Sequence, residues 1–302
     1  MVFGRSVVKI RMRETYSIDK PASPLPLVFD SPHSGTEYPA DFGYVCDFLQ
    51  LRRAGDSYVD ELFASAPTHG APLLKAHFPR SYIDVNRAID DVDPAILDGD
   101  WPYGAINPTA RSDSGIGLIR RLVAPGQPLY GAPLAPEVVK NRIDTYYIPY
   151  HAALKELLDE AHYNFGQVYH VNCHSMPNST AFPKRITAMV GNQIKPSDFV
   201  LSNRDGTTSG TDFMHSMRDI LQDLGYRVSL NDPFKGVELV QRYSRPSRGR
   251  HSVQIEVNKA LYMDEGSCEK SADFDSIRSD IKQFVAGVAR YVGAQGVALA
   301  AD

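Results

Sequence analysis

Apolar runs of strand length alternate with segments of helical periodicity along this chain. Short apolar runs predict strands, and we place them at residues 25–29, 72–76, 82–86, 167–172, 186–190, 226–230 and 252–258. Recurrence of apolar residues at helical spacing predicts helices at residues 47–66, 136–166, 212–224 and 274–292, with Pro149 as a kink in the second. This alternation predicts an α/β three-layer sandwich, in which a mixed, mainly parallel central sheet lies between helices.

One domain is predicted for the whole chain, residues 1–302, because the sequence contains no internal repeat, low-complexity tract or linker. A Pro- and Gly-rich insertion at about residues 91–135 interrupts the alternation. Irregular stretches of this length are uncommon in compact domains unless they have a function. We therefore expect the insertion to cover a site, and the sequence leaves open whether it closes as a lid.

Charge and cysteine content exclude several classes of protein. A net charge of −4 and a pI near 6.1 provide no basic face for nucleic acid. The three cysteines are widely spaced and odd in number, which favours a reducing compartment, and we expect a cytoplasmic protein. Charged residues interrupt the apolar N-terminal stretch, so no signal peptide is expected, and no run reaches the roughly 18 apolar residues of a membrane span.

Two predicted strands deliver a histidine to the same edge of the sheet. His33 follows the strand at residues 25–29, and His174 follows the strand at residues 167–172. Catalytic zinc usually takes three protein ligands and keeps a fourth position for water. For the third ligand we favour Asp56, near the start of the next predicted helix, over Glu37, which lies in the His33 loop. Taken singly, each of these residues has an ordinary structural interpretation.

Glu256 lies within a strand apolar enough to be central in the sheet. Val253, Ile255 and Val257 form one face of this strand, and Glu256 lies on the other. A buried glutamate needs a cation, a water or hydrogen-bond donors, which a general base beside zinc would have. We therefore predict that Glu256 is the catalytic base. The alternative is a glutamate on a solvated edge strand.

Arginines supply candidate groups for binding a carboxylate. Asn86 and Arg87 close the predicted strand at residues 82–86, and the arginine fork suits a carboxylate. A second basic cluster directly precedes the strand of Glu256. We predict substrate contacts from this cluster, although such a run is often only a solvated loop: Arg242, Arg245, Arg248, Arg250 and His251.

Five segments together resemble the N-formylglutamate amidohydrolase family. They are PHSG at 32–35, the acid-containing stretch at 56–63, DVNRA at 84–88, NCHS at 172–175 and IEVNKALYMDE at 255–265. The resemblance implies a phosphorylase/hydrolase-like fold related to the zinc carboxypeptidases. It matches His33 and His174 to histidine ligands, Asn86–Arg87 to a carboxylate-binding pair and Glu256 to the base. Carboxypeptidase-like enzymes have a glutamate three residues after the first histidine, where this chain has Thr36, so the third ligand must come from elsewhere.

The activity implied by the resemblance is hydrolysis of N-formyl-L-glutamate to formate and L-glutamate, as a step of histidine degradation. We expect one Zn²⁺ ion per chain, held by His33, Asp56 and His174, and a small acidic N-acyl amino acid as substrate. One alternative is a related metallohydrolase acting on another N-acyl or N-formimino amino acid. The other is a non-catalytic dicarboxylate-binding protein. The sequence makes no prediction about oligomeric state.

Overall fold

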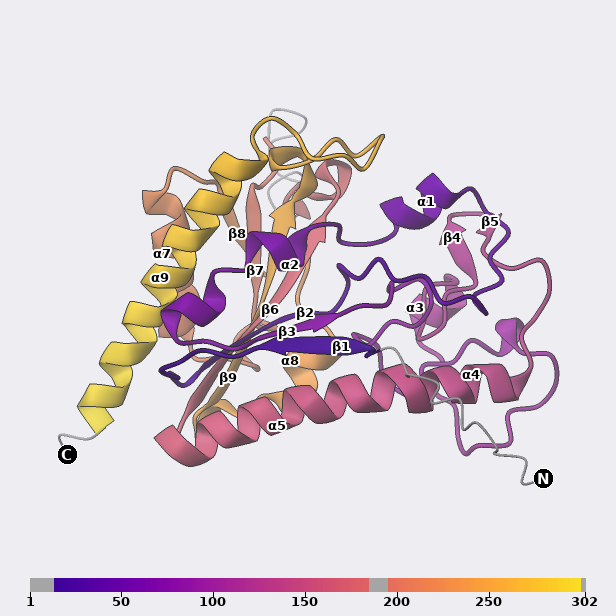
Figure 1. Ribbon diagram of the computed structural model, residues 1–302, viewed down its shortest axis with the longest axis horizontal. Coiled ribbons are helices and arrows are strands. Elements are labelled where there is room, and N and C mark those ends of the chain that lie inside the picture. The colour runs from indigo at the N-terminus through magenta and orange to yellow at the C-terminus, as the bar shows by residue number, and fades with distance from the viewer. Residues whose placement is uncertain (1–13, 185–194, 300–302) are drawn as a thin grey trace, which may run out of the picture.

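The computed structural model describes residues 14–184 and 195–299, and a seven-stranded sheet runs through this part of the chain (Figure 1). In spatial order its strands are β1 (Tyr16–Asp19), β3 (Leu73–Ala76), β2 (Leu27–Ser31), β6 (Val168–Met176), β9 (Arg250–Asn258), β7 (Phe199–Ser202) and β8 (Val228–Leu230). β1 pairs antiparallel with β3, as does β7 with β9, whereas the other four pairings are parallel. The predicted mixed, mainly parallel sheet is confirmed.

Helices cover both faces of this sheet, which gives the predicted three layers (Figure 1). On one face lie α4 (Pro136–Arg142), the π-helical turn Ile143–Tyr147 and α5 (Ile148–Phe165), and on the other lie α2 (Val59–Leu62), α7 (Thr211–Asp223) and α9 (Phe274–Leu299). Successive strand residues point to opposite faces. Leu27 and Phe29 accordingly pack in the core under α7 and α9, while Val28 packs in the core under α5.

The helix predicted at residues 47–66 is three separate pieces. α1 (Phe48–Arg53), α2 and a 3₁₀ turn (Ala66–His69) follow one another, and Tyr58 between α1 and α2 has a left-handed φ of 67°. A helix cannot continue through a left-handed residue. The prediction of one continuous helix was therefore wrong, and Asp56 lies in the break between α1 and α2.

The strand predicted at residues 82–86 is also wrong, because this segment forms turns. The backbone N–H of Tyr82 donates to the carbonyl of Pro79, and that of Arg87 donates to Asp84. The strand predicted at residues 186–190 lies outside the described residues. Elements that the sequence pattern did not predict are β1, β7 and α8 (Glu238–Tyr243).

The insertion at about residues 91–135 packs onto the core through its own apolar side chains. It contains the 3₁₀ turn Pro94–Ile96, α3 (Ala110–Asp113) and the small antiparallel pair β4 (Leu122–Ala124) and β5 (Gln127–Pro128). Leu118, Ile119 and Leu129 are fully buried in the cluster under α5. Further 3₁₀ turns lie at Asn178–Thr180, Pro246–Arg248 and Lys259–Leu261.

Within residues 14–184 and 195–299, no helix combines the length and the apolar composition that a membrane crossing requires.

Candidate active site

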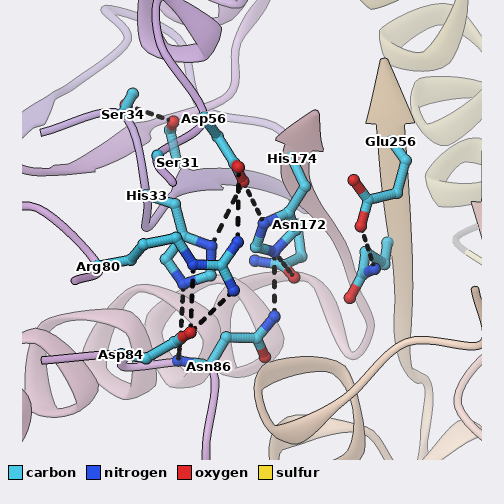
Figure 2. Close-up of polar contacts among 12 residues, drawn as sticks. Ser31, His33, Ser34, Asp56, Arg80, Asp84, Asn86, Asn172, His174 and Glu256 are labelled. Atoms are coloured by element: carbon cyan, nitrogen blue, oxygen red, sulfur yellow. Dashed lines mark hydrogen bonds and ion pairs between the residues drawn. The ribbon is translucent and has the colours of Figure 1, made fainter. Parts of the chain in front are cut away.

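The carboxyl ends of β2, β6 and β9 bring the main predicted site residues together (Figure 2). His33 lies two residues beyond β2, and His174 lies on β6, which extends further than predicted. β6 and β9 are parallel neighbours, and their register places Glu256 directly opposite His174. Ligand sites of α/β proteins gather at this edge of the sheet, beyond the carboxyl ends of parallel strands.

His33, Asp56 and His174 converge on one point with their ligand atoms within 4.8 Å of one another. The Oδ2 atom of Asp56 lies 3.0 Å from Nδ1 of His174 and 3.4 Å from Nδ1 of His33. All three side chains are buried. Glu37, the alternative third ligand, lies elsewhere, with a half-exposed side chain 4.0 Å from Nδ1 of His77.

Hydrogen bonds fix which ring nitrogen of each histidine faces the centre. Nε2 of His33 lies 2.7 Å from a carboxylate oxygen of Asp84, so this nitrogen carries the proton and donates it. Nε2 of His174 lies 2.7 Å from Oδ1 of Asn172, whose own amide nitrogen donates to Asp30. Both Nδ1 atoms face Asp56, and with the proton on Nε2 each would offer its lone pair to a metal ion there, as metal-bound histidines do when a second group holds the other nitrogen.

The Nδ1 atom of His33 is buried and has no hydrogen-bond partner among the described residues. Buried polar atoms are nearly always satisfied, so an orphan atom beside a second imidazole and a carboxylate needs an explanation. Two imidazoles and one carboxylate match the three-ligand set of catalytic zinc sites. The residues present therefore fit a zinc ion.

Charges around the centre keep its carboxylates ionised. Burial alone would raise the pKa of Asp56, but the positive charge of Arg80, with His174 and His33 beside the carboxylate, holds that pKa well below its usual range. Burial also opposes ionisation of Asp84, and again Arg80 and His33 hold its pKa well below its usual range. Burial lowers the pKa of His174, which favours the neutral imidazole that metal binding requires.

Glu256 lies close to Asp56, but its surroundings raise the pKa of its carboxyl group, whereas those of Asp56 lower it. Burial, reinforced by the negative charge of Asp56, raises the pKa of Glu256 to about 8. Its Oε1 accepts a hydrogen bond of 2.8 Å from Nε2 of Gln254. A carboxyl group with a raised pKa takes up a proton more readily than an ordinary glutamate, which suits a general base working near neutral pH.

These residues border a cavity of about 470 Å³. Asp56, His174 and Glu256 lie on its wall together with the predicted pair Asn86 and Arg87. The Nδ2 atom of Asn86 lies 3.1 Å from Nε2 of His174, so this pair adjoins the candidate metal centre. The rest of the lining includes several cations, among them Arg80, Arg111, Arg120 and Lys259.

The predicted basic cluster before β9 does not line this cavity. Arg250 and His251 begin β9, and Arg250 is six residues, or about 20 Å of extended strand, away from Glu256. Other groups hold the members of this cluster: Arg250 pairs with Asp159, Arg242 with Glu238, His251 accepts from the N–H of Gly210, Arg245 donates to the carbonyl of Ser244, and the Arg248 carbonyl contacts His162. Arg250 and His251 lie at the end of β9 opposite to Glu256, so their proximity to Glu256 in sequence does not bring them to the cavity.

Comparison with known proteins gives the family. The sequence profile of the N-formylglutamate amidohydrolase family matches residues 25–263. The chain belongs to this family. Among curated family members, the N-formylglutamate deformylase of Pseudomonas aeruginosa is 27% identical over 248 residues, covering 80% of this chain and 83% of that protein. The corresponding enzyme of Pseudomonas putida is 27% identical over 246 residues, with the same coverage.

Solved structures agree with this assignment. The crystal structure of N-formylglutamate amidohydrolase from Ralstonia eutropha JMP134 has a TM-score of 0.87 and 42% identity, covering 93% of this chain and 99% of that chain. A gene product of Agrobacterium tumefaciens shares the fold, with a TM-score of 0.64 at 15% identity over 93% of this chain and 96% of that one. The predicted family and fold class are thus confirmed, and the chain is a hydrolase of the N-formylglutamate amidohydrolase type.

Several residues of this amidohydrolase site were missed in the sequence. Asp84 was assigned to a strand, although its carboxylate holds His33. Arg80 contacts both Asp84 and Asp56, at 2.8 Å and 3.5 Å. Arg120 belongs to the insertion, where no periodic pattern indicates which side chains point inward. The spacing of four residues between Arg80 and Asp84 indicates an ion pair only on a helix, whereas this segment forms turns, so their contact has no signal in the sequence.

Proposed function

We propose that this chain hydrolyses N-formyl-L-glutamate to formate and L-glutamate at a zinc centre. The observation that carries the proposal is the convergence of His33, Asp56 and His174 beside a buried Glu256 in a cavity rich in cations. The family supports the substrate, since relatives sharing 27% identity are N-formylglutamate deformylases. A role in histidine degradation belongs to the same proposal and rests on the resemblance alone.

His33 and His174 would hold the zinc ion through Nδ1, and Asp56 through a carboxylate oxygen. A zinc ion with an open coordination position polarises a carbonyl oxygen and lowers the pKa of a bound water from about 16 to about 7. Asp84 and Asn172 keep the two imidazoles in the required tautomer and orientation.

Glu256 would move the proton during hydrolysis. Its carboxylate takes a proton from the attacking water, whose oxygen then bonds to the formyl carbon. The same carboxyl group returns that proton to the glutamate nitrogen as the carbon–nitrogen bond breaks. Arg80 and Lys259 are the cations whose charges act on Glu256, and we expect them to stabilise negative charge on the formyl oxygen.

Arg87 would bind a substrate carboxylate. Its Nε and Nη1 atoms donate to the backbone carbonyls of Ile116 and Asn86, at 3.2 Å and 2.9 Å, which hold the guanidinium in place. The other N–H groups of the Arg87 guanidinium are available to a ligand in the cavity that Arg87 lines. Binding energy from the carboxylates of the substrate then aligns the small formyl group, which offers few contacts of its own.

A substrate panel tests this function. We expect the zinc-loaded protein to release free amine fastest from N-formyl-L-glutamate, with a kcat/KM at least about tenfold above those for the N-formimino, N-acetyl and N-succinyl derivatives. A higher kcat/KM for one of the other acyl groups would reassign the substrate within the same hydrolase class. Binding of these compounds with no amine release from any of them would instead support a non-catalytic dicarboxylate-binding protein.

A further inference from the structure

Arg120 is a buried cation on the cavity wall that forms no ion pair with a carboxylate in the part of the chain that the structure describes. Its side chain lines the cavity and the residue is only 8% exposed. Its Nε is fully buried, and no acceptor for it exists in residues 14–184 and 195–299. Its sequence neighbour Arg121 shows the usual arrangement, with Nε 2.7 Å from a carboxylate oxygen of Asp93.

Burial of an unpaired guanidinium is unfavourable, and its surroundings make the cost larger. Burial, together with repulsion from Arg80 and Arg87, lowers the pKa of Arg120 to about 9. The nearby carboxylates of Asp56 and Asp84 already interact with Arg80. A buried polar atom without a partner needs a specific explanation, and an anion that binds in the cavity provides one.

Two hydrogen bonds hold the segment that carries Arg120. The carbonyl of Ile116 accepts from Arg87, and the carbonyl of Leu118 accepts from the backbone N–H of Asp84 at 2.9 Å. The segment of the insertion that carries Arg120 is therefore attached to the segment that carries Arg87. Both guanidinium groups line the same cavity as Glu256.

We infer that Arg120 binds one of the two carboxylates of a dianionic N-acyl amino acid and selects acidic over neutral substrates. This inference rests on the proposed function. Arg87 and Arg120 are both buried, and among the described residues neither forms an ion pair with a carboxylate, so the cavity offers two arginines to two substrate carboxylates. The planar fork of arginine suits bidentate binding of such a group.

The test compares Arg120→Met and Arg120→Lys with the matched control Arg121→Met, in the zinc-loaded full chain. Each protein receives N-formyl-L-glutamate, N-formyl-L-glutamine and the α-amide N-formyl-L-isoglutamine, so that each carboxylate is removed in turn. For Arg120→Met we expect kcat/KM for N-formyl-L-glutamate to fall by about 100-fold, the usual effect of truncating a buried charge pair. The preference for glutamate over one of the two amides should fall toward unity, while Arg121→Met keeps both preferences.

A binding measurement separates this inference from the proposed function. Glutarate, a dicarboxylate with no scissile bond, is titrated calorimetrically into the wild type and each variant. We expect Arg120→Met to weaken glutarate binding by about 100-fold and Arg120→Lys to restore part of it, because lysine keeps the charge and loses the fork. Zinc content and thermal unfolding of each variant report whether it is folded.

Three outcomes distinguish the two claims. In the first outcome, the wild type hydrolyses N-formyl-L-glutamate, and Arg120→Met keeps both substrate preferences and the wild-type affinity for glutarate. This result overturns the inference and leaves the proposed function standing. Glutarate binding that depends on Arg120, without hydrolysis by the wild type, supports the inference and overturns the function. If the wild type neither binds glutarate nor hydrolyses the formyl compound, both are overturned.

Discussion

Replacement of Glu256 by glutamine is expected to lower kcat for N-formyl-L-glutamate by about 1,000-fold, within the usual range for loss of a general base. Glutamine has nearly the same shape and its carbonyl oxygen can still accept the hydrogen bond from Gln254. It cannot take a proton from water. Because Glu256 is not one of the three candidate ligands, the variant should keep its zinc.

Turnover is measured under saturating substrate, with zinc content determined on the same sample. Glu269→Gln is the control, since the Glu269 side chain is 70% exposed and outside the cavity. Turnover near the wild-type rate in a Glu256→Gln protein that retains zinc would show that another group is the base.

Replacement of Asp56 by alanine is expected to reduce zinc affinity by more than about 100-fold. Loss of a group that only hydrogen-bonds to a metal ligand reduces metal affinity by at most about 100-fold, and loss of a ligand should exceed this. Hydrolysis should fall with the zinc. The reason is geometric, since Asp56 is the carboxylate whose oxygen lies beside both Nδ1 atoms. The measurement is competition for zinc against a chelator of known affinity.

Glu37→Ala is the matched control, because Glu37 was the alternative ligand in the sequence and lies beside His77 in the structure. This variant should bind zinc as the wild type does. Zinc loss in Glu37→Ala, together with retention in Asp56→Ala, would reverse the assignment of the third ligand.

The sequence contained enough information to place His33, His174 and Glu256 near one another. Buried parallel strands have apolar runs that end at a common edge, so residues at those ends must meet. Period-2 alternation in β9 also separated Glu256 from the apolar face of its strand. These inferences depend on local pattern and on one general property of parallel sheets.

Asp56 was predicted as a ligand near the start of a helix, whereas it lies in a break between two helices. The pattern predicted a continuous helix, whereas the chain breaks between α1 and α2 at residues that include Gly55 and the left-handed Tyr58. That break is held by tertiary contacts, including the hydrogen bond from the N–H of Asp56 to the carbonyl of His33. Helical periodicity carries no information about such a contact.

The positions of the arginines also depend on tertiary contacts that the sequence pattern does not indicate. Arg250 precedes Glu256 by six residues, and an extended strand turns that short separation into a long distance. Arg120 is more than 100 residues away from Glu256 in sequence, yet both line one cavity. Its position depends on contacts between the insertion and residues 84–87, which a single sequence does not show.

The most direct test of the central claim is hydrolysis of N-formyl-L-glutamate measured together with metal content, before and after chelation. We expect about one zinc ion per chain and release of formate and L-glutamate in equal amounts. Removal of the metal should abolish hydrolysis, and zinc re-addition should restore it. A purified protein that hydrolyses N-formyl-L-glutamate equally well without metal, or that holds zinc and releases no amine from this compound, would contradict a zinc-dependent deformylase.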